Sequence, residues 1–293
     1  MIYQVSHLTE YVYTDVVTTS HHDLHLLPRS VAHQSIRWED LSVDPVPSRR
    51  RDRVDYFGNR ATHLEIQQPH RRMAVLSRSE IEIIPRQGPL PTIAPAWEVV
   101  RDRVRVIHSP ADIDIRELAY PSAFAIPSAA VAAYAAPSFT PGRPIVEALV
   151  DLMHRIHADF TYDPQATNVS TPVEEVLAHR HGVCQDFAHL ALACLRALGL
   201  PGRYVSGYLV TATPGQTALV GADASHAWIQ SYCPGFGWID LDPTNDVIPS
   251  DRHVTIAYGR DFGDVTPLRG VITGGGQHDL RVAVTVTPRS FNQ

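Results

Sequence analysis

The stretch His181-Gly182-Val183-Cys184-Gln185-Asp186-Phe187-Ala188-His189 decides how the rest of this chain is interpreted. After Cys184, apolar residues recur at intervals of three and four, which predicts a helix with one buried face. Gly199 and Pro201 end this helix, because glycine suits the left-handed cap and proline cannot continue the turn. Cys184 is therefore expected in the first helical turn. The buried stripe consists of Phe187, Leu190, Ala191, Cys194, Leu195 and Leu198.

The predicted position of Cys184 suits a nucleophile. Unpaired backbone N–H groups and the positive end of the helix dipole favour a thiolate at a helix start, and the thiolate is the reactive form of cysteine. A second interpretation stays open on this stretch alone, because free cysteine is among the most buried residue types and Cys184 can equally be a packing residue. The choice between the two needs residues from elsewhere in the chain.

Length and composition bound the class of protein. A chain of 293 residues with 44% hydrophobic residues is long enough for two domains and a sizeable core. Its 25 basic and 31 acidic residues give a net charge of −6, which argues against nucleic acid as the main partner. Three cysteines do not form a disulfide framework, so a reducing compartment, the cytoplasm, is expected. The sequence shows neither a membrane-length apolar run nor a signal-peptide pattern, so no membrane association is expected.

The first part of the chain has the pattern of a β domain. Apolar and polar residues alternate in short segments separated by turn residues, which is typical of a sandwich-like or barrel-like sheet. After an N-terminal strand region, further strands are expected at 35–43, 53–57, 61–66 and 73–84. The segment His21-His22-Asp23-Leu24-His25 has the composition of a metal cluster. A strand with solvated histidines is preferred, because no complementary cysteine or carboxylate pattern accompanies it.

The whole chain is predicted to be an α+β protein, with a sandwich-like β domain followed by a papain-like core in which the cysteine helix packs on an antiparallel sheet. Within the core, helices are expected at about 145–158 and after the capping-box pattern Thr171-Pro172-Val173-Glu174, and a strand at 203–210. A short helix is expected near 113–120. The predicted regions are an N-terminal β domain at 1–90, a proline-rich linker with short helices at 91–144, and a catalytic core with a C-terminal strand at 145–293.

A hairpin late in the sequence supplies partners for a reactive cysteine. A thiol enzyme needs a base for the proton of the sulfur and a third group that orients this base. Strands at 225–232 and 238–242 are separated by a five-residue loop and are predicted to pair. His226 begins the first strand and Asp242 ends the second. These two residues are the candidates for base and orienting carboxylate.

The register of this hairpin can be worked out. If Tyr232 faces Trp238, then Asp242 faces Trp228 and lies diagonal to His226. Diagonal neighbours in antiparallel strands are about 7–8 Å apart at the backbone, which an imidazole–carboxylate hydrogen bond can bridge. The alternation of side chains along each strand puts four residues on one face of the hairpin: His226, Trp228, Asp240 and Asp242. The docking of the cysteine helix against that face cannot be derived from the sequence.

Other residues compete for these roles with less support. Asp240 faces Gln230, one pair further from His226, so it is the weaker candidate for orienting the base. His189 points to another side of the helix than Cys184, and no other cysteine has an evident base. His179 and His181 are expected at the surface, Trp228 and Trp238 are expected to pack across the strands, and Cys194 and Cys233 are expected in the core stripe and in a turn.

Four segments resemble the core of bacterial transglutaminase-like proteins: 182–188, 196–208, 226–228 and 237–244. The order Cys, His, Asp is the triad order of that superfamily. The N-terminal segments 11–13, 26–28 and 57–59 and the C-terminal segment 259–268 are similar to the flanking parts of one bacterial branch. The resemblance implies a papain-like core with Cys184 as nucleophile, His226 as base and Asp242 as the orienting group, and acyl transfer from an amide.

The sequence therefore predicts a thiol-dependent acyl-transfer enzyme acting on an amide or peptide substrate. Hydrolysis by a peptidase or amidase is preferred, because water needs no second binding site; a protein or peptide transglutaminase and a non-catalytic binding module of the same fold are the alternatives. The backbone N–H of Cys184 is the expected first oxyanion donor, and Gln185 and Tyr162 are candidates for the second. No cofactor is expected, and no metal, because the sequence lacks an EF-hand-type acidic loop.

Overall fold

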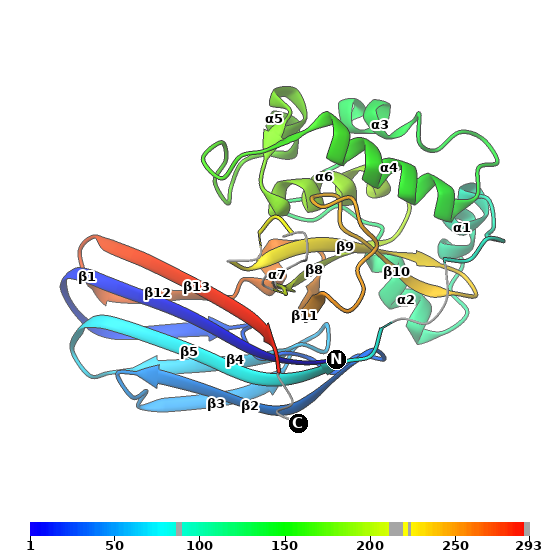
Figure 1. Cartoon of the computed structure of the whole chain (residues 1–293). Coiled ribbons are helices and arrows are strands. Elements are labelled where there is room, and N and C mark those ends of the chain that lie inside the picture. Colours follow the sequence, from blue (N-terminus) through cyan, green and yellow to red (C-terminus); the bar gives the residue numbers. More distant parts are fainter. Residues whose placement is uncertain (86–89, 211–218, 222–223, 290–293) are drawn as a thin grey trace.

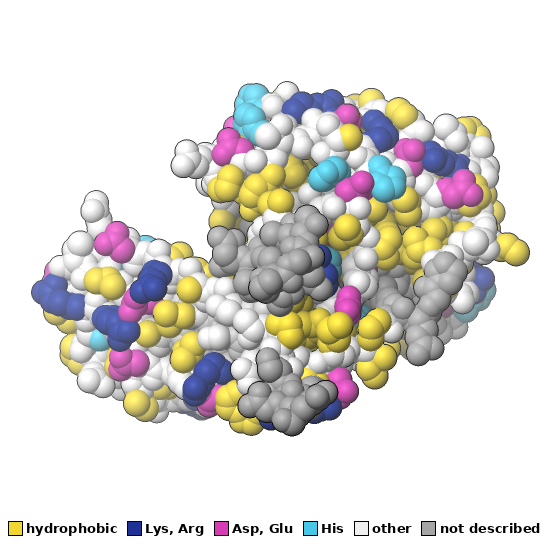
Figure 2. Space-filling model, viewed as in Figure 1, with side chains coloured by type: hydrophobic (Ala, Val, Ile, Leu, Met, Phe, Trp, Pro, Cys, Tyr) yellow, Lys and Arg dark blue, Asp and Glu magenta, His cyan; other side chains and the backbone are white. Residues whose placement is uncertain are grey.

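The computed structural model describes residues 1–85, 90–210, 219–221 and 224–289. The chain has three layers (Figure 1): helices lie on one face of a four-stranded antiparallel sheet, and a seven-stranded sheet lies across the other face. This arrangement confirms the predicted α+β class. None of the described helices combines the length and the apolar character needed to cross a membrane. On the face shown in Figure 2, acidic and basic side chains are interspersed over both the helical part and the seven-stranded sheet.

The N-terminal sheet is organised around one long strand. β1 contains neither glycine nor proline and continues for 23 residues. Its pairing with β5 shifts register between Val12 and Val17, where the strand bends, so its first half pairs with β5 and its second half pairs with β4. The sheet curls around its own apolar core as a result. Its first five strands are β1 (Ile2–Leu24), β2 (Gln34–Asp44), β3 (Arg49–Val54), β4 (Arg60–Ile66) and β5 (His70–Ile83), in the order β2-β5-β1-β4-β3.

The end of the chain returns to this sheet. The sequence predicts one last strand that pairs with a sheet already present, and the structure has two, β12 (Leu268–Gly274) and β13 (His278–Pro288). Both pair antiparallel with β1, β13 along its first half and β12 along its second. Gly274, Gly275 and Gly276 join them with positive φ angles, which glycine adopts without strain.

One predicted strand of the N-terminal region is misplaced. The expected strand at 53–57 is β3, which ends at Val54. Asp55 stops it, because its backbone N–H and C=O bind Asn59 and Gly58 across a turn and its carboxylate accepts the N–H of Asn59 at 2.7 Å. The other three internal strands are confirmed within a few residues.

Helices occupy most of the middle of the chain. α1 (Trp97–Val104), α2 (Pro110–Glu117) and α3 (Ala129–Ala135) lie in the proline-rich region, followed by α4 (Ile145–Asp159) and α5 (Val173–His179). The helix expected near 113–120 is α2, which begins earlier because Ser109 and Asp112 cap it. The predicted capping box at the start of α5 is wrong: the Thr171 hydroxyl accepts the N–H of Asn168 instead, and Pro172 occupies the cap position.

The four-stranded sheet confirms the predicted hairpin register. Tyr232 pairs with Trp238 and Gln230 pairs with Asp240. The loop is two residues shorter than expected, because pairing includes Cys233 and Gly237. The strands are β8 (Gly202–Leu209), β9 (His226–Cys233), β10 (Gly237–Leu241) and β11 (His253–Gly259), in the order β10-β9-β8-β11. The remaining elements are the short parallel pair β6 (Thr161–Tyr162) and β7 (His181–Gly182), and the one-turn helix α7 (Phe262–Val265).

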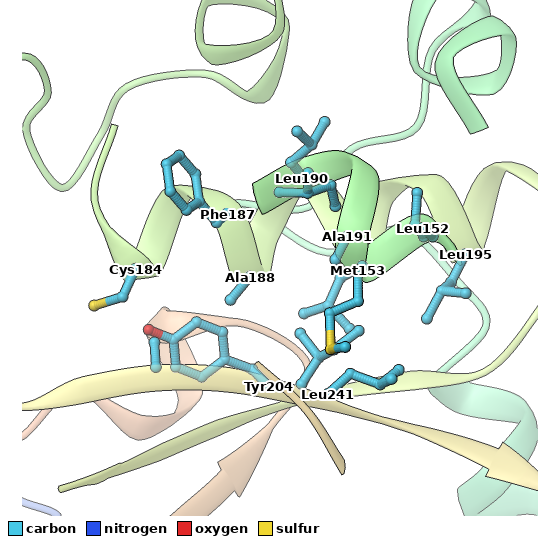
Figure 3. Close-up of a cluster of buried hydrophobic side chains, with 14 of the residues drawn as sticks. Leu152, Met153, Cys184, Phe187, Ala188, Leu190, Ala191, Leu195, Tyr204 and Leu241 are labelled. Carbon is cyan, nitrogen blue, oxygen red and sulfur yellow. The ribbon is translucent and has the colours of Figure 1, made fainter. Parts of the chain in front are cut away.

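The cysteine helix, α6 (Cys184–Ala197), lies at the centre of the core (Figure 3). α6 packs on β8 and β9, but the predicted apolar stripe does not face the sheet as a unit, because Phe187 contacts Phe160 and the Cys194 thiol approaches the carbonyl of Val131 on α3. Residues 186–196 are buried on every side, not on one face as expected. The reason is that α3, α4 and α5 cover the side of α6 that faces away from the sheet. Gly199 has a φ of +72° and ends the helix as predicted. Because α6 is held on all sides, its first turn is fixed relative to the sheet.

Two amide side chains of the N-terminal sheet clamp the edge strand β11. Gln34 accepts the N–H of Thr255 at 2.9 Å and donates to its carbonyl at 2.7 Å. Asn59 makes the same pair of bonds with Tyr258, both at 2.7 Å. Both amides are almost fully buried. They supply the hydrogen bonds that a neighbouring strand would otherwise provide, so the free edge of the four-stranded sheet is closed by the N-terminal sheet.

The clamp predicts a specific loss of stability. Gln34→Leu keeps most of the side-chain volume but leaves the N–H and C=O of Thr255 buried without partners. We expect the free energy of unfolding, measured by urea denaturation, to fall by about 2–4 kcal/mol. Gln67→Leu is the matched control, because Gln67 is exposed, and we expect it to change the free energy by less than about 0.5 kcal/mol. Equal effects of the two substitutions would contradict the clamp.

Candidate active site

The first turn of α6 positions Cys184. Asp186 reaches back over the helix start, accepting the N–H of Val183 at 2.8 Å and the hydroxyl of Thr167 at 2.6 Å. A Cβ at Gly182 would lie 2.8 Å from the Asp186 carboxylate, so only glycine leaves room for this bond. This hydrogen bond therefore explains why Gly182 and Asp186 flank Cys184 in the sequence. An acidic residue three positions after the cap is a recognisable sequence signal for the start of a helix.

The structure brings His226 and Asp242 together as the hairpin register requires. Nε2 of His226 lies 2.9 Å from Oδ2 of Asp242, and both side chains are completely buried. Trp228 and Asp240, on the same face, form the neighbouring pair, in which the indole N–H donates to Oδ1 of Asp240 at 2.8 Å. Asp240 therefore accepts the hydrogen bond of Trp228 and does not orient His226.

The Asp242 carboxylate accepts hydrogen bonds from five donors. Oδ1 accepts the backbone N–H groups of Thr244 and Asn245, at 3.0 and 3.2 Å. Oδ2 accepts Nε2 of His226 and the amide of Asn245, each at 2.9 Å, and Nε2 of His253 at 3.0 Å. Asn245 also accepts the N–H of Val220, which ties the segment before β9 to the same centre. The turn after β10 thus holds the carboxylate in one orientation.

His253 is a polar residue of this centre that the sequence does not reveal. It begins β11, is 3% exposed, and packs edge-to-face on Trp228 with ring centres 5.2 Å apart. β11 is brought to this centre by its pairing with β8, a strand on the other side of the hairpin in the sequence. The turn 242–245 supplies Asn245 and Thr244.

The charges of the pair stabilise each other. Burial lowers the pKa of His226, but the Asp242 carboxylate and the Cys184 thiol raise it, so that the pKa of His226 is raised to about 10. Burial raises the pKa of Asp242, and the two histidines His226 and His253 lower it by more, to well below its usual range. The favoured state is a carboxylate beside an imidazolium.

Cys184 raises the pKa of His226 through its charge and through a side-chain hydrogen bond, and because Nε2 is bound to Asp242, Nδ1 is the nitrogen left for the sulfur. Interaction with Cys184 is the largest influence after Asp242 that raises the pKa of His226. Nδ1 is buried, and no other described residue lies within hydrogen-bonding geometry of it. A Cβ at Gly221 would lie 3.0 Å from Nδ1, so glycine keeps the space beside the ring open. Cys184 is 9% exposed, the most accessible of the three cysteines.

The competing residues have structural roles. His189 is buried and accepts the N–H of Phe262 through Nε2 at 3.2 Å. His179 and His181 stack on each other, exposed and half-buried respectively. Cys194 is completely buried, and burial raises its pKa to about 12. Burial also raises the pKa of Cys233, which lies where the hairpin turns.

One of the two expected second oxyanion donors has another hydrogen-bond partner. The Gln185 amide donates to the carbonyl of Val169 at 3.2 Å, so it is committed to a loop. Tyr162 lies on β6, paired with Gly182. Figure 3 shows a further hydroxyl, that of Tyr204 on β8, at the Cys184 end of the core. Burial, followed by the charges of Cys184 and two carboxylates, raises the pKa of Tyr204 well above its usual value, so it remains a protonated donor.

Two groups of residues have the composition of a metal site. The donor atoms of His226, Asp242 and His253 converge, but both nitrogen–oxygen distances are those of hydrogen bonds. Within the described part of the chain, the outer nitrogens also have no partner of the kind that normally orients metal-binding histidines. We assign this group to a hydrogen-bond network. The segment 21–25 is not one cluster, because His21 stacks outward on His63 while His22 points into the sheet and His25 binds Asp55.

Comparison with known proteins identifies two family models. Residues 132–243 match the model described as the transglutaminase-like superfamily, and residues 3–82 match the bacterial transglutaminase-like N-terminal region. A solved structure from Cytophaga hutchinsonii, named as a candidate cysteine protease, is similar over 100% of this chain and 92% of that chain, with a TM-score of 0.73 and 21% identity. This likeness concerns the fold.

Relatives extend along nearly the whole chain. An uncharacterized protein of Mycobacterium tuberculosis is 43% identical over 98% of this chain and 92% of its own length. An uncharacterized protein of Mycobacterium leprae is 36% identical over 97% of this chain and 98% of its own. A protein-glutamine gamma-glutamyltransferase of Pseudomonas aeruginosa is 30% identical, but over 37% of this chain and 19% of its own length.

The burial of His189 predicts a pH dependence. Burial lowers its pKa to about 4, below the ordinary value of 6.5 that applies in the unfolded chain. The native state therefore resists protonation, so this contribution to stability is complete above pH 6.5 and is lost as the pH falls toward 4. We expect His189→Gln to flatten the fall in the free energy of unfolding by up to about 1.4 kcal/mol per pH unit in that window. His108→Gln, at an exposed position, should leave the slope unchanged; an unchanged slope in His189→Gln would contradict the assignment.

Proposed function

The chain belongs to the transglutaminase-like superfamily, and from that premise we propose that it is a thiol-dependent acyl-transfer enzyme, a peptidase or amidase. The observation that supports this most strongly is the buried His226–Asp242 pair, 2.9 Å apart, beside a cysteine at a helix start. The three residues come from α6, β9 and the turn after β10. Their chemistry is that of a nucleophile, a proton carrier and the carboxylate that orients it.

In the first step, the Cys184 sulfur attacks the carbonyl carbon of an amide, and the thiol proton passes to Nδ1 of His226. The S–C bond forms as the carbonyl π electrons move onto oxygen. The backbone N–H of Cys184, at the first helical position, is the first donor to this oxygen. We place the Tyr204 hydroxyl as the second donor, because it stays protonated and lies at the Cys184 end of the core.

In the second step, the C–N bond breaks and the amine leaves. His226 supplies the required proton from Nδ1, the nitrogen left for the sulfur, while Nε2 stays bound to Asp242. Asp242 keeps its charge throughout, because its other hydrogen bonds hold it as an anion. The products are a free amine and a thioester on Cys184.

In the third step, a nucleophile resolves the thioester. Water attacks the carbonyl carbon and gives a proton to His226. The C–S bond then breaks, His226 returns this proton to the sulfur, and the products are a carboxylic acid and the free thiol. An amine in place of water would give a new amide. Hydrolysis is favoured because it requires no second substrate site. A transferase is the second candidate, supported by the partial likeness to a protein-glutamine gamma-glutamyltransferase, and a binding module that does no chemistry is the third.

One experiment separates the three candidates. The purified chain is incubated with a mixed peptide and amide library, with and without added methylamine, and products are identified by mass spectrometry. All 25 basic residues of the chain are arginine, so cross-linking to its own lysine side chains cannot confuse the result. We expect hydrolysis products in both samples, because water resolves the thioester.

Matched cysteine variants control this experiment. Cys184→Ala should abolish product formation, whereas Cys233→Ala, which removes another buried thiol, should retain it. Products that carry methylamine and no hydrolysis product would identify a transferase. Binding of a library member without any product would identify a binding module and would sink the enzymatic proposal.

A further inference from the structure

We propose that His253 is a positioning residue that shares the Asp242 carboxylate with His226 and limits how tightly this carboxylate holds the proton of His226. The proposal rests on the function proposed above for Cys184 and His226. It assigns a role to the second histidine, which the three-step chemistry does not use.

The geometry that carries this inference is convergence on a single oxygen. Nε2 of His226 and Nε2 of His253 lie 2.9 and 3.0 Å from the same atom, Oδ2 of Asp242. The Asn245 amide donates to that atom as well, at 2.9 Å. Asp242 and His226 side chains are 0% exposed and His253 is 3% exposed, so water does not compete for these bonds. Three donors therefore compete for one oxygen.

His253 takes part as a neutral donor. Its Nδ1 is buried without a partner among the described residues, so a proton there would be unsatisfied, while Nε2 must carry the hydrogen that Asp242 accepts. The charged and titratable groups that face it are Asp242, His226 and Asp240. Burial, together with the charge of His226, lowers the pKa of His253 despite the opposing influence of the two carboxylates.

Sharing an acceptor weakens each of the bonds to it. Every hydrogen bond donated to a carboxylate stabilises its charge and lowers its affinity for a further proton. With His253 in place, Asp242 attracts the proton of His226 less strongly than it would with one donor fewer. Among the described residues, Asp242 and Cys184 are the groups that raise the pKa of His226, so removal of the His253 donor strengthens the influence of Asp242. The imidazolium should then become harder to deprotonate.

The fold fixes His253 independently of the hairpin. It begins β11, and the Gln34 clamp holds Thr255, two residues along the same strand. The ring is also held edge-to-face against Trp228. His253 can therefore hold Asp242 independently of the turn that contains Thr244 and Asn245, and the N-terminal sheet supports it through β11.

The test compares two substitutions at this position in the full chain. His253→Phe keeps a ring against Trp228 but removes the donor, whereas His253→Gln keeps an N–H donor. Nitrogen-15 NMR of labelled histidine gives the pKa of His226 in each variant. We expect His253→Phe to raise it by about 0.5–1 pH unit relative to the native chain. We expect His253→Gln to stay within about 0.2 unit of the native value.

A reactivity measurement reports the same effect at the sulfur. The rate of Cys184 alkylation by iodoacetamide is followed across pH, with the labelled residue identified by mass spectrometry. In His253→Phe, the pH at which the rate changes on the alkaline side should move upward by the same amount as the NMR value. A merely structural role would lower the rate at every pH and move neither value.

The outcomes separate failure of this inference from failure of the proposed function. An unshifted His226 in a folded His253→Phe chain overturns the shared-acceptor role, even if Cys184 reacts normally. A shifted His226 with an unreactive Cys184 keeps the role and overturns the proposed nucleophile. If circular dichroism shows His253→Phe to be unfolded, His253→Leu provides the donor-free variant, and the same shift is required of it.

Discussion

The Asp242 carboxylate is the constraint on which the candidate site depends. A fully buried charge is stable only if its hydrogen-bonding capacity is satisfied, and this one accepts five donors within 3.2 Å. Two of these donors are backbone groups of the turn after β10, so the carboxylate is held before any histidine is considered. The orientation of His226, and with it the nitrogen left for the Cys184 sulfur, follows from that fixed acceptor.

The two sheets share the task of holding this centre. The hairpin β9–β10 brings His226 to the carboxylate, and β11 brings His253 to it from the other edge. β11 is itself an edge strand, and the amides of Gln34 and Asn59 complete its hydrogen bonding. The N-terminal sheet therefore forms one face of the core and also supports a strand that contacts the site. This dependence gives a physical reason for the two regions to occur in one chain.

Local sequence signals predicted the parts of the site that depend on local structure. The helix at Cys184 and the register that joins His226 to Asp242 each follow from periodicity within about twenty residues. His253 could not be predicted in this way, because its position depends on the pairing of β11 with β8, and the whole hairpin β9–β10 lies between these two strands in the sequence. The errors have local causes too: Asp55 ends β3 early, and Thr171 binds Asn168 where a helix cap was expected.

The most direct test of this account is the alkylation rate of Cys184 in two neighbouring variants. Asp242→Asn replaces an acceptor that five donors require, whereas Asp240→Asn changes an equally buried carboxylate that serves Trp228 and Gln230. Iodoacetamide labelling near neutral pH, read by mass spectrometry, should reach Cys184 first in the native chain. We expect the labelling rate to fall on the order of 100-fold in Asp242→Asn and less than about threefold in Asp240→Asn. Equal losses in the two variants, or no loss in Asp242→Asn, would contradict it.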